Sequence, residues 1–303
     1  MAAHVNIIDH DATYKALDTE LLRTYNQDFR QLATYLGLFE PTVVSAGTAL
    51  FQYKVTGTLL DGTNADGSSG SSYVEGDFIA RSKYTLTREY FDRMPFHPYA
   101  LESTAQAILE GGLVNTIVRT DQKAASQLRG KVIADLFAGL GNGTGKAAPE
   151  SGEWSLQEMI AYADGTLADT METNGDAGGR LVHFIHPMDA AKFLAETPVT
   201  TQTAFGLTYL ASFLGAENVL LTNRVTRGTC FVTTVENIRV FGCDFGTLGA
   251  AGLGYQSTDG GLIGVYHKAN DDHASVTTYF AKSMLMVPEV TDYIVKGSTT
   301  PLV

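Results

Sequence analysis

The sequence predicts an α+β fold that is divided into more than one subdomain. Three observations support this prediction: apolar residues at helical spacing near the N-terminus, two alternating segments typical of a long hairpin, and a later mixture of helix-like and strand-like segments. The chain has 303 residues, and one hydrophobic core stops growing at roughly 250 to 300 residues. We therefore expect at least two cores.

Composition argues against several classes of protein. Hydrophobic residues make up 44% of the chain, yet no apolar stretch reaches the roughly 18 residues of a membrane span. The formal net charge is −12 and no segment concentrates Lys or Arg, which argues against a module that reads nucleic-acid sequence. No secretory signal is visible, so we expect synthesis in the cytoplasm, with Cys230 and Cys243 buried and unbridged.

The first expected element is an amphipathic helix over residues 14–36. Its apolar residues lie three or four positions apart and form one stripe: Leu17, Leu21, Tyr25, Phe29, Leu32 and Leu36. Pro41 and the small residues after it end the helical pattern. No nearby segment offers this stripe a partner, so we expect it to contact a neighbouring subunit.

A long β-hairpin is expected next. Residues 50–60 and 73–87 alternate polar side chains with apolar ones, which are Phe51, Tyr53, Val55 and Leu59 in the first segment and Phe78, Ala80, Tyr84 and Leu86 in the second. Residues 61–72 hold turn-forming and small residues, as expected of a mobile tip. An eleven-residue strand reaches ~36 Å, against a radius of gyration of ~19 Å for a compact chain of this length. We expect the hairpin to project from the body and to lie on a neighbouring subunit.

Two capping boxes predict the next helices. Ser103 with Gln106 predicts a helix that runs to about residue 137. Gly111 and Gly112 cost this helix roughly 2 kcal/mol relative to alanines and predict a kink. A second box, at residues 155 and 158, predicts another helix.

The remaining segments predict a mixture of strands and helices. LVHFIH predicts a short buried strand that runs into a helix beginning at Pro187. A further helix is expected near residues 203–214, ending at Gly215. Four later segments predict strands: ENVLLTN, TCFVTTVENIRVFG, LIGVYHK and ASVTTYFAKSMLMV.

The glycine-rich segment GLGNGTGK at 139–146 does not match a phosphate-binding loop. A Walker loop needs Gly where Leu140 stands and Ser or Thr where Ala147 stands. A dinucleotide loop needs Gly where Thr144 stands, and it follows a strand, whereas this segment follows a helix. We expect a helix end followed by a turn, with glycines at positive φ.

The histidines, serines and cysteines give no catalytic or metal-binding pattern. His183 and His186 would point to opposite faces of a strand, so we expect them to satisfy polar groups and not to bind a metal. The run His267, Asn270, Asp271, Asp272 and His273 could supply oxygen ligands to a divalent cation, but its place between two strands favours a solvated turn. No GxSxG motif is present. We expect no enzyme activity, cofactor or metal, although a site assembled from distant segments would escape this test.

The order of these segments resembles that of the major capsid proteins of tailed double-stranded DNA bacteriophages, which have the Hong Kong 97 fold. The resemblance rests on the N-terminal helix, the hairpin, the helix that ends at AGLGNGTGKAAPESG, and the segments LVHFIHPMDAAKFLAE and ENVLLTNRVTRGTCFVTTVENIRVF. It implies an N-terminal arm (1–45), an E-loop hairpin (46–92), a P domain (93–150 and 261–303, with a spine helix at about 103–137) and an A domain (151–260).

The resemblance also implies a function and partners. The chain would be the major head protein of a virion and would self-assemble, as pentamers and hexamers, into an icosahedral shell around double-stranded DNA held by non-specific contacts only. An encapsulin-like compartment around a cargo enzyme is the alternative. No coiled-coil extension precedes the arm, so we expect a separate scaffolding protein and a portal as further partners, and no membrane.

The same resemblance gives candidate contact residues between subunits. On the E-loop they are Phe51, Tyr53, Lys54, Val55, Phe78, Arg81, Lys83 and Tyr84, and on the arm they are Leu21, Tyr25, Phe29 and Leu32. The founding member of the family cross-links a lysine on its E-loop. Its partner asparagine and catalytic glutamate match no position in this sequence, so we expect no covalent cross-link.

Overall fold

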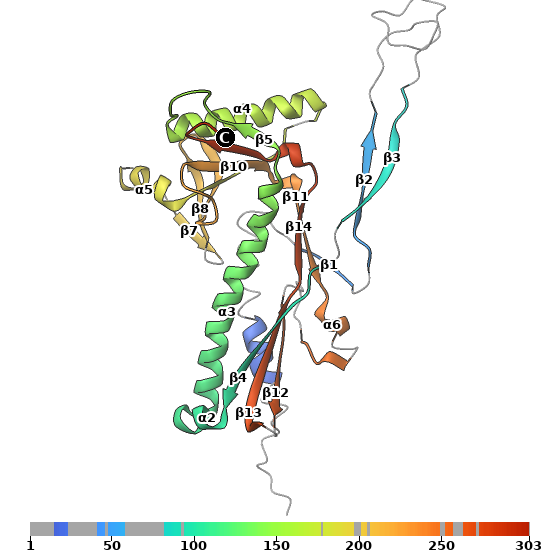
Figure 1. Ribbon diagram of the computed structural model, residues 1–303, viewed down its shortest axis with the longest axis vertical. Coiled ribbons are helices and arrows are strands. Elements are labelled where there is room, and N and C mark those ends of the chain that lie inside the picture. The colour runs from blue at the N-terminus through green and yellow to red at the C-terminus, as the bar shows by residue number, and fades with distance from the viewer. Residues whose placement is uncertain are drawn as a thin grey trace, which may run out of the picture. The chain divides into compact units, whose positions relative to one another are not determined.

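The computed structural model describes residues 15–23, 41–45, 48–57, 82–91, 94–176, 178–196, 201–204, 207–248, 252–256, 263–270 and 273–302 (Figure 1). The chain divides into two compact units. The segment Gly47–Arg93 is the hairpin unit, and Met1–Ala46 together with Met94–Val303 form the body.

The largest sheet of the body has seven strands in the described part of the chain. Their spatial order is β5 (Gly145–Ala147), β15 (Val295–Ser298), β10 (Thr229–Thr234), β6 (Leu181–Ile185), β9 (Ala216–Leu221), β8 (Leu207–Phe213) and β7 (Thr201–Ala204). The pairs β15–β5 and β6–β9 are parallel, and the other pairs are antiparallel. Helix α4 (Leu156–Asn174) packs on β10 and β15, and α5 (Pro187–Glu196) also contributes to this core. Met159, Ala163 and Leu167 of α4 are fully buried there.

A second core lies between the long helix α3 (Leu113–Ala138) and two three-stranded sheets (Figure 1). The first sheet has the order β12 (Ile263–Asn270), β13 (Ser275–Lys282) and β4 (His97–Thr104), and the second has the order β1 (Pro41–Val44), β11 (Ile238–Cys243) and β14 (Met284–Pro288). Leu128, Val132 and Phe137 of α3 are buried in this core, which also includes Phe184 of β6 and Leu220 of β9. Although α3 has 26 residues, neither it nor another helix in the described ranges is long and apolar enough to cross a membrane.

The first capping box is wrong, because Ser103 lies in a strand that the sequence did not predict. Ser103 pairs with Val276 in the antiparallel ladder of β4 and β13. Helix α2 (Ala105–Gly111) begins one residue later than a Ser103 cap would place it. The Oγ1 atom of its actual N-cap, Thr104, accepts the backbone N–H of Ala107 at 3.4 Å. β4 contains Pro98, and a proline argues against a strand because it lacks the N–H that a ladder needs. In this sheet β4 is an edge strand, where the missing N–H can face away from the ladder.

The kink expected at the glycine pair is confirmed as a complete break between α2 and α3. Gly112 has a φ of 77°, which ends α2, and α3 begins at the next residue. The second capping box is also confirmed. The Ser155 hydroxyl accepts the N–H of Glu158 at 3.2 Å, and the Glu158 carboxylate accepts the N–H of Ser155 at 2.8 Å.

The glycine-rich segment after α3 differs from the expected positive-φ turn. Gly139 and Gly143 have φ values of −63° and −62°, and a 3₁₀ turn (Gly139–Asn142) leads directly into β5. Close packing explains these glycines: a Cβ atom at Gly143 would lie 2.7 Å from the carbonyl oxygen of Ile294. The segment therefore allows two backbones to approach each other closely.

The helix expected near residues 203–214 is wrong. The segment forms β7 and β8, and Phe213 pairs with Ala216 across a two-residue turn into β9. Leu214 and Gly215 have φ values of 51° and 92°, as a type I′ hairpin turn requires. Leucine is an unusual first residue of such a turn, so the sequence does not indicate a hairpin here.

The other expected strands are confirmed with two refinements. ASVTTYFAKSMLMV supplies β13 and β14, which belong to different sheets. LVHFIH, ENVLLTN and LIGVYHK contain β6, β9 and β12, and the helix expected at Pro187 is α5. TCFVTTVENIRVFG supplies β10 and β11, which belong to different sheets. Asn237 marks the corner between them, since its amide donates to Thr233 Oγ1 at 3.1 Å and to the carbonyl of Val290 at 3.0 Å.

Candidate assembly surface

The described part of the hairpin unit is a pair of antiparallel strands, β2 (Phe51–Thr56) and β3 (Thr85–Tyr90). The register places Phe51 opposite Tyr90 and Val55 opposite Leu86. Directly opposite residues share a face, so one face carries Phe51, Tyr53, Val55, Leu86, Arg88 and Tyr90. Tyr84, two residues before Leu86, continues this row opposite Gly57, whose Cβ position would lie 2.6 Å from its ring. These seven residues are the aromatic face.

Alternation in the sequence explains the two faces of the hairpin. The opposite face carries polar side chains, which are Gln52, Lys54, Thr56, Thr85, Thr87 and Glu89. The expected alternation is confirmed for Phe51, Tyr53 and Val55, and β3 continues three residues beyond the expected end at residue 87. The expected tip and the start of the second strand lie outside the described residues.

The aromatic face is exposed. The exposed fractions of its apolar side chains run from 40% for Phe51 to 61% for Leu86 and Tyr90. Contiguous exposed apolar side chains of this size mark interaction sites on soluble proteins. A two-stranded hairpin is also marginally stable by itself, so a covering surface would stabilise it.

Arg88 organises the aromatic face. Its guanidinium carbon lies 4.2 Å from the centre of the Phe51 ring, and its nitrogens donate to the hydroxyls of Tyr53 at 2.9 Å and Tyr90 at 3.3 Å. These hydrogen bonds raise the pKa of Arg88 above its usual value. Sequence reasoning missed this residue because arginine breaks the apolar pattern. Its alternation with Leu86 and Tyr90 was the signal that could have found it.

The hairpin and the rest of the chain differ in charge. Described residues 48–57 and 82–91 contain three basic residues, Lys54, Lys83 and Arg88, and one acidic residue, Glu89, which gives a net charge of +2. The whole of the hairpin unit, Gly47–Arg93, carries −1, so the body carries −11 of the chain's −12. The positive charge of the hairpin is therefore local to its two described strands.

The expected contact residues of the hairpin fall into three groups. Phe51, Tyr53, Val55 and Tyr84 lie on the aromatic face. Lys54 lies on the polar face, and Lys83 is exposed just before β3. Phe78 and Arg81 lie outside the described residues.

The N-terminal segment has a partner within its own chain, contrary to expectation. Residues 15–23 form a helix, here the N-terminal helix, whose Leu22 is buried in the core beneath α3 with Leu21 partly buried beside it. The sequence stripe ran through Leu21, whereas the fully buried residue is Leu22. Tyr25, Phe29 and Leu32 lie outside the described residues.

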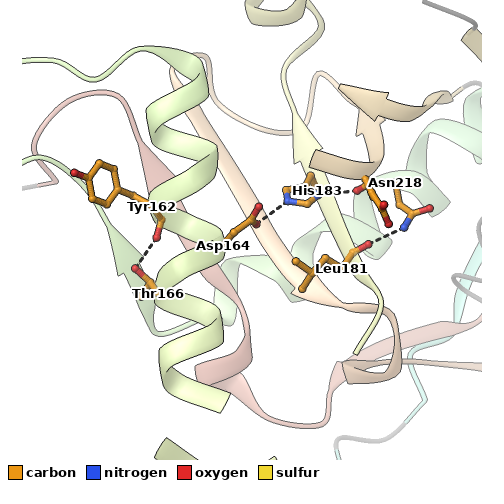
Figure 2. Close-up of polar contacts among 7 residues, drawn as sticks. Tyr162, Asp164, Thr166, Leu181, His183 and Asn218 are labelled. Atoms are coloured by element: carbon orange, nitrogen blue, oxygen red, sulfur yellow. Dashed lines mark hydrogen bonds and ion pairs between the residues drawn. The ribbon is translucent and has the colours of Figure 1, made fainter. Parts of the chain in front are cut away.

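His183 and His186 satisfy polar groups, as expected. Figure 2 shows Asp164 of α4 directed at His183 of β6, with 2.7 Å between the carboxylate and Nε2. The Nδ1 atom of His183 lies 2.8 Å from the carbonyl oxygen of Glu217. His186 accepts the N–H of Met188 at 3.1 Å, at the start of α5.

His267 corrects the expectation of a solvated turn at residues 267–273. It lies within β12, and its side chain is fully buried between Asp18 and Asp121. The described residues contain no group of three or more His, Cys, Asp or Glu placed to hold a metal ion. Asp271 and Asp272 lie outside them.

Both cysteines are buried and free, as expected. Burial raises the pKa of Cys230, beneath α4, to about 12. Burial also raises the pKa of Cys243, at the end of β11. Since the thiolate is the reactive form, neither thiol is activated as a nucleophile at neutral pH.

No protein-family model and no curated protein sequence matches the chain. Solved structures do match. The capsid of cyanophage A-1(L) has a TM-score of 0.54 at 12% identity, covering 88% of this chain and 92% of that one. The mature capsid of bacteriophage PhiM1 has a TM-score of 0.53 at 7% identity, covering 88% and 87%. The holo-SrpI encapsulin of Synechococcus elongatus PCC 7942 has a TM-score of 0.54 at 10% identity, also covering 88% and 87%. The chain has the Hong Kong 97-type capsid fold that these shell proteins share.

Proposed function

We propose that the chain is the major structural protein of a phage head, in which many copies form an icosahedral shell around double-stranded DNA. The capsids of cyanophage A-1(L) and PhiM1, which share the fold over most of their length, support this proposal. The observation that supports self-assembly is the exposed aromatic face of the hairpin.

The occupant proposed for the aromatic face is a second copy of the chain. Charge favours this pairing at the strands, because described residues 48–57 and 82–91 carry +2 and the body of each copy carries −11. Arg88 is already held by two tyrosine hydroxyls and an aromatic ring, so binding would cost little side-chain entropy there. In this proposal the hairpin is the E-loop, and the body contains the P and A domains, with β5 and β15 completing the A-domain sheet.

Expression of the full chain, with and without a co-expressed scaffolding protein, tests the assembly part. Sedimentation and electron microscopy should show capsomers or closed particles. A single species at 32.5 kDa across protein concentrations in both conditions would contradict the proposal.

The encapsulin-like compartment is the second candidate, because the SrpI encapsulin matches with the same TM-score as the cyanophage capsid. The contents of native particles distinguish the two functions. A phage head should hold nuclease-protected double-stranded DNA and copurify with a portal, whereas a compartment should hold a packaged protein and no genome. The net charge of −12 favours the head, since an acidic wall would keep packaged DNA from adhering to it.

A further inference from the structure

Three distant segments of the body meet at the buried side chain of His267. The Nδ1 atom lies 2.5 Å from Asp18 Oδ1, on the N-terminal helix, and the Nε2 atom lies 2.8 Å from Asp121 Oδ2, on α3. The side chain of His267 is fully buried, and those of Asp18 and Asp121 are 3% and 6% exposed. The cluster therefore ties the N-terminal helix to both β12 and α3.

The geometry constrains the protons of this cluster. A neutral imidazole donates from one nitrogen only, and an ionised carboxylate can only accept. Two ionised carboxylates facing the two nitrogens are both satisfied only when His267 is an imidazolium. Among the described residues, Asp121 Oδ1 is buried without a hydrogen-bond partner, so no described donor other than His267 offsets the charge of this carboxylate.

We propose that Asp18, His267 and Asp121 form a charged clamp that holds the N-terminal helix on the body, and that this helix loosens when His267 loses its second ring proton. Among the described residues, Asp18 and Asp121 are charged groups that face His267 from the two helices, and β13 places the uncharged Thr278 opposite it. Further along, Asp135 of α3 pairs with Lys282 of β13, and Glu102 of β4 accepts from Ser275.

The direction of the pH dependence follows from the surroundings of His267. Burial by itself lowers the pKa of His267, but the hydrogen bonds and charges of Asp121 and Asp18 outweigh burial and raise it to about 9. A raised histidine pKa means that the clamp is complete below pH ~6.5 and is lost as the pH rises through about 9.

The size of the effect follows from the same values. If undocking separated His267 from both carboxylates, the ratio of docked to undocked N-terminal helix would fall roughly 100-fold between pH 6.5 and 9.5. Only Asp18 leaves with the helix, while Asp121 stays beside β12. We therefore expect about a tenfold change.

Hydrogen exchange of the full chain, read by mass spectrometry at pH 6.5 and 9.5 and corrected for intrinsic exchange rates, tests the clamp. Peptides that cover residues 15–23 should exchange about tenfold faster at pH 9.5, while peptides from α4 should change little. At pH 6.5, His267→Gln should give the same acceleration. His183→Gln is the matched control, because it removes another buried histidine and should leave residues 15–23 unchanged.

Asp18→Asn separates a charged clamp from simple packing. An asparagine amide can donate to a neutral Nδ1 while Nε2–H still donates to Asp121, so the helix should stay docked and its exchange should lose most of the pH dependence. This variant also carries the test if His267→Gln does not fold. An equal pH response in the wild type and Asp18→Asn, or no acceleration of residues 15–23 at pH 9.5, would overturn the proposal.

Discussion

Replacing Phe51, Tyr53 and Tyr84 with serine should prevent assembly without unfolding the body. These side chains are 40%, 54% and 53% exposed. An aromatic side chain presents about 150–250 Å², so the three leave roughly 220–370 Å² to bury in a contact. At ~25 cal/mol per Å² this area corresponds to at most about 5–9 kcal/mol per subunit. Even a third of that, ~2 kcal/mol, would lower the association constant of each contact roughly 30-fold.

Sedimentation and electron microscopy measure the assembly of this variant, and circular dichroism together with Trp154 emission measures the body. The control is Gln52→Ser with Thr85→Ser and Thr87→Ser, which makes three changes in the same strands but on the polar face. The control should assemble. If the aromatic-face variant unfolds as a monomer, the hairpin stabilises its own body. If both variants fail to assemble equally, the aromatic face has no special role.

Three further predictions concern covalent bonds and stability. Particles boiled under reducing conditions should run as monomers on a denaturing gel, since Lys54 and Lys83 have no recognisable cross-linking partner; ladders would contradict this. Ser155→Ala should lower the free energy of unfolding by about 1 kcal/mol in chemical denaturation of unassembled subunits, because the capping box of α4 is lost. Gly143→Ala should cost about 1–3 kcal/mol in the same assay, because its Cβ would lie 2.7 Å from the Ile294 carbonyl oxygen; an unchanged midpoint would refute the packing role of this glycine.

The sequence predicted elements whose signals are local. The Ser155 capping box, the break at Gly112 and the faces of β2 each depend on residues a few positions apart. The errors occurred where a distant strand decides the structure. β8 has apolar residues at helical spacing, but pairing with β9 keeps it extended. β4 contains a proline and is a strand because β13 lies beside it.

The contacts of His267 could not be predicted from the sequence for the same reason, whereas those of Arg88 could. His267 is bonded to residues 249 and 146 positions away, so no motif spacing could reveal it. Arg88 was within reach, because hairpin register alone places it opposite Tyr53. For the N-terminal helix, the sequence predicted the helix but not which of its leucines is buried. A stripe through Leu21 and one through Leu22 differ by one residue, and only the tertiary contacts show which leucine is buried.

Structural likeness without sequence likeness is physically reasonable for this chain. The core of the body requires only apolar side chains of suitable volume at positions such as Val132, Phe184 and Phe280. Many combinations of apolar residues satisfy that requirement. Identities of 7% to 12% with the cyanophage A-1(L) and PhiM1 capsids are therefore compatible with the same fold. A contact between copies must instead match shape and charge at a particular place. If copies pair as proposed, differences between shells of this fold should therefore concentrate in surfaces such as the one around Arg88.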